Sequence, residues 1–224
     1  MKSKVISIIK TGLIEYGKAL EMQGELLAAR QAGLIKDTLL LVEHPPVITL
    51  GRRGDPRHIL VSEEYLKEQG ASVFEVSRGG DVTYHGPGQV VGYPIMDLDG
   101  FGKDIRKFVF NIEEVIIRLL QECYGIAAGR EDGRYTGVWV GNDKIAAIGI
   151  AVKKWVTMHG FAFNVNTHLE HFKWIMPCGL EGRGVTSLAV LTGAECDMDM
   201  LYHQVAGYFC KVFDVDAEIE KWVM

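Results

Sequence analysis

The stretch from Arg78 to Gln89 is the densest concentration of residues in the chain that could bind a ligand. Its sequence is Arg-Gly-Gly-Asp-Val-Thr-Tyr-His-Gly-Pro-Gly-Gln, between two β-type runs. Glycines permit positive φ angles and let a ligand approach the backbone, where N–H groups can donate to it. The spacing matches neither the G-x-x-x-x-G-K-[ST] phosphate loop nor a strand-to-helix G-x-G-x-x-G. From the residues alone, the stretch is either a ligand-binding loop or a long polar hairpin loop.

One of the four cysteines, Cys178, lies between a proline and a glycine in Trp-Ile-Met-Pro-Cys-Gly-Leu. Such a tight turn can hold a side chain partly exposed, as a nucleophile requires. A free thiol more often packs as a small hydrophobic side chain, and both interpretations stay open from the residues alone. For Cys123, Cys196 and Cys210, on or beside predicted helices, we expect the packing role.

Lys144 opens an apolar run after the Gly141–Asp143 turn, where a lysine is normally a solvated surface charge. His85 and His159 could each act as a base, although most histidines in such places serve hydrogen bonding. His168 and His171 are three residues apart, but no carboxylate or thiol nearby completes a ligand set. We therefore expect no metal site there.

Eight short runs with β-type composition predict strands, and Asn142-Asp143 between two of them predicts a hairpin turn. The runs are Val5–Ile9, Thr38–Val42, Val47–Leu50, Ser72–Val76, Val90–Ile95, Thr136–Val140, Lys144–Val152 and Val156–Asn164.

Helical periodicity is clearest over residues 105–123, with Asp104 as N-cap and Gly125 as the stop. A weaker stripe over residues 16–27 is closed by Gly33, and a third helix is predicted from about residue 197 to 213. This order predicts an α/β (α+β) fold with a mixed, partly antiparallel sheet flanked by helices. Without internal repeats or linkers, we expect one domain over residues 1–224.

The bulk composition excludes several classes of protein. A formal charge of −5 and a pI of about 5.8 argue against a protein that coats nucleic acid. No apolar run approaches the roughly 20 residues that a membrane span needs. The basic amino end is followed by too short an apolar stretch for a signal peptide, and the cysteines form no C-x-x-C pair. We therefore expect a cytoplasmic protein without a membrane partner.

Together these segments resemble the lipoyl(octanoyl) transferases, the octanoyl-[acyl-carrier-protein]:protein N-octanoyltransferase family. The likeness covers roughly residues 38–190, and its longest motif is Arg-Gly-Gly-x-x-Thr-Tyr-His-x-Pro-Gly-Gln-x-x-x-Tyr-Pro at Arg78–Pro94. Five separated motifs in register make chance agreement improbable. The other four are His44–Val47 with Gly51–Gly54, Lys144–Gly149, His159–Asn166, and Pro177–Gly179 followed by Val185–Leu188.

The resemblance implies a fold like the catalytic domain of biotin and lipoate protein ligases. It implies that Cys178 is the acyl-thioester nucleophile and that Lys144 is its partner. It also implies that three segments bind substrate around the reacting centre and an acyl tunnel, with Val82, Ala147, Ile148 and Phe161 as candidates for the apolar lining. The segments are Arg78, Gly79, Gly80, Asp81, Val82, Thr83, Tyr84 and His85; Ala147, Ile148 and Gly149; and Gly160, Phe161 and Ala162.

The chemistry suits these residue types. An unperturbed thiol with a pKa of about 8.5 is mostly protonated at neutral pH, and an ammonium beside it raises the thiolate share. A neutral Lys144 could instead take a proton from the attacking amine, and partial burial would favour that form. Both roles stay open. Backbone N–H groups near Gly79, Gly80 or Gly179 are candidates to stabilise the oxyanion.

The implied reaction has two halves. Cys178 attacks the thioester of an acylated acyl carrier protein, and a lysine of a lipoyl domain then attacks the acyl-enzyme to give an amide. The implied acceptors are lipoyl domains of 2-oxoacid dehydrogenase complexes or the glycine cleavage H protein. Neither ATP, a cofactor nor a metal is expected. Because the carrier is acidic, docking should use a basic patch. The candidates are Lys153-Lys154 and Arg52-Arg53-Arg57.

Three other functions compete with this one. An ATP-dependent lipoate–protein ligase has the same expected fold but needs no cysteine at position 178. A non-catalytic protein that binds lipoyl domains or acyl carriers would have no use for the Lys144–Cys178 pair. A cysteine hydrolase would need a Cys-His-Asn arrangement, and the sequence shows no clear one.

Overall fold

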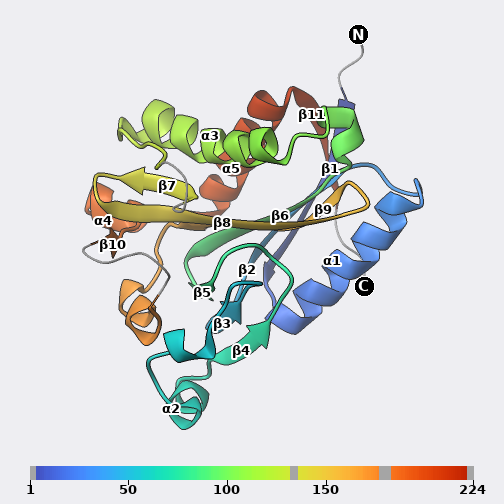
Figure 1. Ribbon diagram of the computed structural model, residues 1–224. Helices are drawn as coiled ribbons and strands as arrows, with labels where there is room; N and C mark the ends of the chain where they lie inside the picture. Colours follow the sequence, from blue (N-terminus) through green and yellow to red (C-terminus); the bar gives the residue numbers. More distant parts are fainter. Residues whose placement is uncertain (1–3, 132–135, 177–182, 221–224) are drawn as a thin grey trace.

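The computed structural model describes residues 4–131, 136–176 and 183–220 (Figure 1). Cys178 and Gly179 therefore lie outside the described residues. The main sheet has eight strands in the order β10-β8-β9-β6-β2-β1-β11, with β7 paired to β8. Its strands are β1 (Lys4–Leu13), β2 (Thr38–Glu43), β6 (Gln89–Ile95), β7 (Gly137–Val140), β8 (Asp143–Lys153), β9 (Val156–Asn164), β10 (Gly184–Val185) and β11 (Val215–Glu220).

The predicted mixed sheet is confirmed. The central pairs β2–β6, β6–β9, β8–β9 and β7–β8 are antiparallel, whereas β1 runs parallel to β2 and β11, and β10 runs parallel to β8. All eight predicted strands are present, and Gly141 and Asn142 turn the chain between β7 and β8. In the β8–β9 hairpin, Ala147 faces Ala162 and Gly149 faces Gly160. Gly149 and Gly160 carry no side chain, and neighbouring backbone lies close to both of them.

A second, three-stranded sheet corrects one prediction. Residues 82–85, placed by sequence within a long loop, form β5 (Val82–His85). This strand pairs antiparallel with β3 (Val47–Leu50), which also pairs with β4 (Ser72–Glu75). The pairing with β3 overrides the turn-rich composition on either side of β5.

Helices cover both faces of the main sheet (Figure 1). α3 (Ile105–Tyr124) and α5 (Met198–Phe213) pack with one face around a large apolar cluster, and α1 (Tyr16–Gln31) packs on the other. The predicted caps are confirmed: the Asp104 side chain accepts from the N–H of Lys107, and Gly125 takes a φ of 66°. Besides β5, the sequence interpretation missed two helices, α2 (Glu63–Glu68) and α4 (Leu188–Thr192), and the strands β10 and β11.

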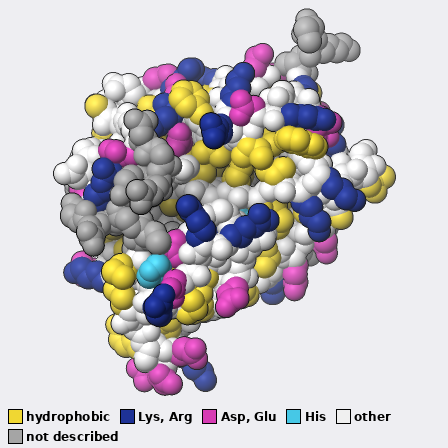
Figure 2. Space-filling view, in the orientation of Figure 1, with side chains coloured by type: hydrophobic (Ala, Val, Ile, Leu, Met, Phe, Trp, Pro, Cys, Tyr) yellow, Lys and Arg dark blue, Asp and Glu magenta, His cyan; other side chains and the backbone are white. Residues whose placement is uncertain are grey.

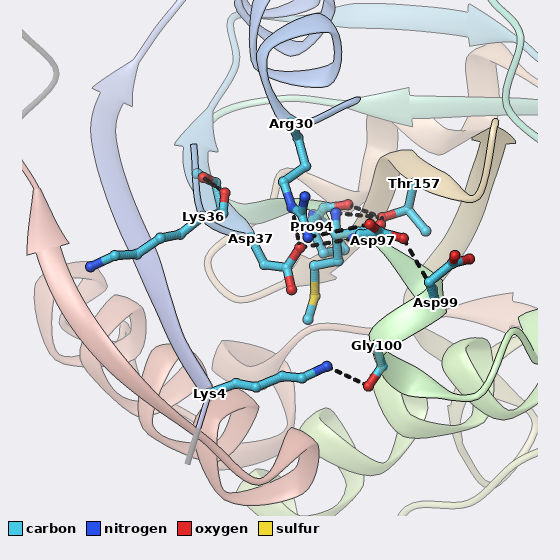
Figure 3. A network of polar contacts seen from close by, with 11 residues as sticks. Lys4, Arg30, Lys36, Asp37, Pro94, Asp97, Asp99, Gly100 and Thr157 are labelled. Carbon is cyan, nitrogen blue, oxygen red and sulfur yellow. Dashed lines mark hydrogen bonds and ion pairs between the residues drawn. The ribbon is translucent and has the colours of Figure 1, made fainter. Parts of the chain in front are cut away.

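A polar network ties α1 to the ends of the sheet strands (Figure 3). Arg30 of α1 donates to the carboxylate of Asp37 at 2.7 Å and lies 3.4 Å from that of Asp97. Asp37 also accepts from the N–H of Asp97 at 2.8 Å. The Thr157 hydroxyl donates to the carbonyl of Pro94 at 2.6 Å and accepts from the N–H of Met96. These contacts fix the β8–β9 hairpin near its turn, where β9 begins.

Cys123, Cys196 and Cys210 lie among the described residues as free thiols. Cys196 and Cys210 are half-buried, but Cys123 is exposed near the end of α3, so the expected packing is wrong for that residue. Its Sγ lies 3.5 Å from the hydroxyl of Tyr208.

Among the described segments, no helix combines the length and hydropathy that a membrane span requires.

Candidate active site

A cavity of about 940 Å³ lies beside β5, β8, β9 and α3, a size at the upper end for small-molecule sites. Figure 2 shows hydrophobic side chains between α3 and β8, next to Lys and Arg side chains. On the α3 side the cavity is lined by Ile105, Val109 and Phe110. It therefore offers both an apolar wall and a basic rim.

The cavity extends around one edge of β8. Ala147 and Gly149 line it, and so do Ile148 and Ile150. Neighbouring residues of a strand point to opposite faces of the sheet, so a cavity lined by both sets must pass the strand's edge. In the described chain, β7 pairs with β8 only as far as Ala147. The lining therefore includes residues of the Arg78 loop and residues of α3.

The structure brings together almost all of the predicted substrate-binding residues. The predicted residues that line the cavity are Arg78, Gly79, Gly80, Asp81, Val82, Thr83, His85, Ala147, Ile148, Gly149, Gly160, Phe161 and Ala162, together with Lys144.

Tyr84 alone of the predicted set lies elsewhere. Its ring packs in the apolar cluster of the small sheet, and its hydroxyl lies 2.7 Å from Nδ1 of His171. His171 stacks on Trp174 and His168, so its role in the described structure is packing and hydrogen bonding. We assign Tyr84 to the core rather than to the cavity wall.

Arg78 is a structural organiser of the glycine-rich loop. Its buried guanidinium donates to the hydroxyl and carbonyl of Thr49 on β3, to the carbonyl of Asp81 and to that of Gly79. Burial lowers its pKa, and the loop supplies carbonyl acceptors in place of water. The Asp81 carboxylate is likewise engaged, at 2.7 Å from Nδ1 of His58. Both side chains hold the loop in shape.

The same loop is joined to the β8 edge by a hydrogen bond that corrects one expectation. The N–H of Gly79 donates to the carbonyl of Ile150 at 2.9 Å. It is therefore not available to an oxyanion. A side chain at Gly149 would meet the Gly79 carbonyl at 2.8 Å, so this close approach requires glycine. Gly80 stays a candidate donor, and Gly179 lies outside the described residues.

A chain of buried amides fixes the tautomer of His85. The carbonyl of Thr186 accepts from the Asn164 amide, whose oxygen accepts from Gln89 at 2.8 Å. Because the Gln89 amide nitrogen donates to Asn164, its side-chain oxygen faces His85 and can only accept. Nδ1 of His85, 2.8 Å away, therefore donates to that oxygen. Burial lowers the pKa of His85 to about 3, which keeps the ring neutral. Nε2 of His85 is then an acceptor beside the cavity.

Two other buried histidines stand near it. His44 contacts the Tyr93 hydroxyl through Nε2 and the carbonyl of Ile14 through Nδ1, both at 2.7 Å. His159 has a φ of 57° and contacts Ser77 at 3.2 Å, while burial lowers its pKa to about 4. Sequence left the role of His159 open, and it lines the cavity as a neutral polar side chain.

Lys144 lies at the start of β8, where the cavity meets β7. Its Nζ donates to the carbonyl of Thr136 at 3.2 Å and lies 4.8 Å from the centre of the Trp139 ring. Burial, followed by repulsion from Arg183, lowers the pKa of Lys144 to about 8. Both protonation states are therefore accessible near neutral pH. The predicted partner, Cys178, lies outside the described residues.

Several residues around this site escaped the sequence interpretation. Tyr16, Gln89, Tyr93, Glu113 and Asn164 all line the cavity. Gln89 and Asn164 were inside matched motifs but had no assigned role. Glu113 carried a usable signal, because a glutamate four residues after Val109 and three before Ile116 falls on the apolar stripe of a helix.

Fold and site together match one family. A model of the lipoyl protein ligase A/B catalytic domain matches residues 15–210, and the chain belongs to that family. Within it, the chain is 62% identical over 208 residues to an octanoyltransferase of Caldicellulosiruptor bescii, covering 93% of this chain and 91% of the relative. It is 57% identical to an octanoyltransferase of Desulforamulus reducens, covering 95% and 92% of the two chains.

Solved structures agree on the fold. A lipoate–protein ligase A bound with ATP superposes with a TM-score of 0.77 at 17% identity, covering 100% of this chain and 90% of the other. The biotin protein ligase of Aquifex aeolicus superposes with a TM-score of 0.53 at 11% identity, covering 93% and 69%. The predicted likeness to the catalytic domain of these ligases is confirmed.

Proposed function

We propose that this protein is an octanoyltransferase that moves an octanoyl group from an acyl carrier thioester to a lysine of a lipoyl domain. The observation that carries the proposal is the 62% identity, across nearly both full lengths, to an octanoyltransferase. At that identity the transferase relatives outweigh the ligases, whose 17% identity supports the fold alone. The chain is thus an enzyme of the acyltransferase class that acts in protein lipoylation.

The roles proposed for individual residues rest on the motifs and on the cavity. Cys178 forms the acyl thioester, and Lys144 provides the ionisable amine beside it. Because the pKa of Lys144 is about 8, both its charged and its neutral form are accessible near neutral pH. The charged form could favour the Cys178 thiolate, and the neutral form could take a proton from the attacking amine. The apolar wall from Val82, Ala147, Ile148 and Phe161 suits an alkyl chain.

We also propose an acyl carrier protein as donor, and lipoyl domains of 2-oxoacid dehydrogenase complexes or the glycine cleavage H protein as acceptors. One catalytic domain over residues 1–224, acting in the cytoplasm without a cofactor, completes the proposal. Its support is the family match over residues 15–210.

Substrate requirements test the reaction class. The purified protein is incubated with a lipoyl domain and either octanoyl-carrier thioester without ATP, or free octanoate with ATP. The transferase acylates the lipoyl domain only from the thioester. Acylation from free octanoate and ATP alone would identify a ligase, and binding of the lipoyl domain without acylation from either donor would identify a non-catalytic binding protein.

A further inference from the structure

The carboxylate of Glu113 is buried beside the cavity, although α3 could have placed it in solvent. The residue is 7% exposed and lies on the stripe of α3 that faces the sheet. Burying a carboxylate costs free energy unless it is hydrogen-bonded, so its hydrogen-bond partners indicate its structural role. Both of its oxygens are engaged. One accepts from the backbone N–H of Gly137 at 3.0 Å, and the other from Nε of Arg130 at 3.1 Å.

The Gly137 contact connects Glu113 to Lys144. Gly137 begins β7 directly after Thr136, whose carbonyl accepts from Nζ of Lys144. Gly137 has a φ of 141°, and a Cβ there would lie 2.5 Å from the carbonyl of Ala146 and 3.3 Å from Cε of Lys144. The lysine stem therefore passes over the one backbone unit that Glu113 holds.

Arg130 holds the second oxygen of the Glu113 carboxylate. Its guanidinium lies 3.7 Å from the centre of the Phe110 ring and donates to the Phe110 carbonyl at 3.1 Å. It also pairs with Glu114, the next residue of α3. Arg130 is thus shared between two carboxylates, so it does not cancel the charge of Glu113 alone.

Charges from every element around Lys144 contribute to its environment. α3 supplies Glu113 and Glu114, the segment before β7 supplies Arg130 and Glu131, and the segment before β10 supplies Arg183. Arg183 contacts Glu131 at 3.2 Å, and its guanidinium lies 4.9 Å from the Trp139 ring centre. Asp143 precedes Lys144 on β8. Of these groups, Glu113 favours the charged form of Lys144, and Arg183 opposes it.

We propose that Glu113 is the positioning residue of Lys144: it anchors the Thr136–Gly137 backbone on which the ammonium rests, and its charge stabilises that ammonium. The inference rests on the proposed catalytic role of Lys144. Glu113 lies on α3, outside the matched motifs, and in this proposal it supports acyl transfer through Lys144.

Titration of Lys144 itself tests the inference without turnover. Full-length protein labelled with ¹³C at lysine Cε is titrated by NMR, and the Lys144 resonance is assigned by its loss from Lys144→Arg. Glu113→Gln should move the Lys144 midpoint to lower pH. Glu114→Gln removes a charge from the same helix and the same arginine without touching Gly137, and should leave the midpoint nearly unchanged. An unchanged midpoint in folded Glu113→Gln would overturn the proposal.

A second variant separates charge from geometry and guards against loss of folding. Glu113→Asp keeps the charge but is too short to hold the Gly137 N–H. Its Lys144 midpoint should return towards wild type, while octanoyl transfer stays reduced about tenfold to a hundredfold, as expected for a displaced catalytic group. A wild-type transfer rate in Glu113→Asp would contradict the anchoring role. If Lys144→Ala itself transfers normally, the proposed catalytic role of Lys144 fails, and the titration still decides whether Glu113 positions it.

Discussion

At the residue scale, Glu113 opposes the effect that burial and Arg183 have on the pKa of Lys144. Burial and Arg183 lower its pKa, whereas Glu113 raises it, and the result is a value of about 8 instead of 10.5. In the unfolded chain the lysine has its ordinary pKa. The folded protein therefore binds the proton less tightly than the unfolded chain does, so Lys144 destabilises the fold wherever the unfolded chain is protonated.

Because the pKa of Lys144 is lower in the folded protein than in the unfolded chain, removing its amine should stabilise the protein at neutral pH. The penalty is fully present below about pH 8 and vanishes as the pH rises towards 10.5. Lys144→Met, in a Cys178→Ser background that removes the thiol's charge, should raise Tm at pH 7. Allowing for partial exposure, we expect a gain of about 1 kcal/mol, or about 2–4 °C for a chain of this size. Calorimetry at pH 7 and pH 10 measures it, and a gain that does not shrink at pH 10 would contradict the assigned cause.

At the element scale, β7 places the backbone that contacts Lys144, and its first residue has no room for a side chain. Gly137 combines a φ of 141° with the close carbonyl of Ala146. Gly141, the residue that directly follows β7, has a φ of 59° and open space around it. Comparing an alanine substitution at Gly137 with one at Gly141 therefore distinguishes the cost of a steric clash from the cost of a strained φ.

We predict that Gly137→Ala destabilises the protein by at least about 2 kcal/mol, because a strained φ and a backbone clash add together. Gly141→Ala should cost about 1 kcal/mol, since only the φ is strained. Transfer activity should fall in Gly137→Ala and persist in Gly141→Ala. Urea unfolding together with the acylation rate provides the check; equal losses of stability would show that Ala146 yields to the new methyl group.

Elements with a strong local pattern were predictable from the sequence, and elements made by tertiary pairing were not. α3 carries its apolar face, its Asp104 cap and its Gly125 stop within its own residues. β5 is only four residues long beside four glycines, and its strand geometry comes from pairing with the distant β3. β11 does alternate, as Val-Asp-Ala-Glu-Ile-Glu, but it is short and follows a helix directly, so its place in the sheet comes from pairing with the distant β1.

The site was predictable where residues do chemistry and not where they support it. Lys144 and the Arg78 loop lie in motifs whose types and spacing resemble one family. The place of Glu113 on the apolar stripe of α3 signals burial but not its partner, because it accepts from the backbone N–H of Gly137. Thr136 likewise contacts Lys144 through its backbone carbonyl, and backbone contacts leave no pattern in side-chain types. The engagement of the Gly79 N–H by Ile150 likewise depends on a loop crossing a strand 71 residues later in the chain.

At the scale of the whole molecule, the two candidate basic patches lie at very different places. Lys153 and Lys154 stand at the turn of the β8–β9 hairpin, nine residues along the strand from Lys144, or about 30 Å. Arg53 lines the cavity itself, and so does Arg106 of α3. A carrier that delivers its acyl group at Lys144 is better served by the cations at the cavity.

We therefore predict that docking of the acidic carrier depends on Arg53 and Arg106. Reversing both charges (Arg53→Glu with Arg106→Glu) should lower kcat/KM for the carrier thioester at least about tenfold, and salt should lessen the difference from wild type. Lys153→Glu with Lys154→Glu reverses the same number of charges and should stay close to wild type. Steady-state kinetics at two ionic strengths compares them; a larger loss in the lysine pair would move the docking site to the hairpin turn.

The central claim, an acyl group carried by Cys178 with the help of Lys144, is tested most directly by intact mass. Wild type, Cys178→Ala and Lys144→Ala are each mixed with octanoyl-carrier thioester in the absence of ATP. We predict one octanoyl adduct on wild type, none on Cys178→Ala and a slowly formed one on Lys144→Ala, with the wild-type adduct passing to an added lipoyl domain. An adduct of equal size on Cys178→Ala, or acylation of the lipoyl domain by that variant at the wild-type rate, would contradict the account.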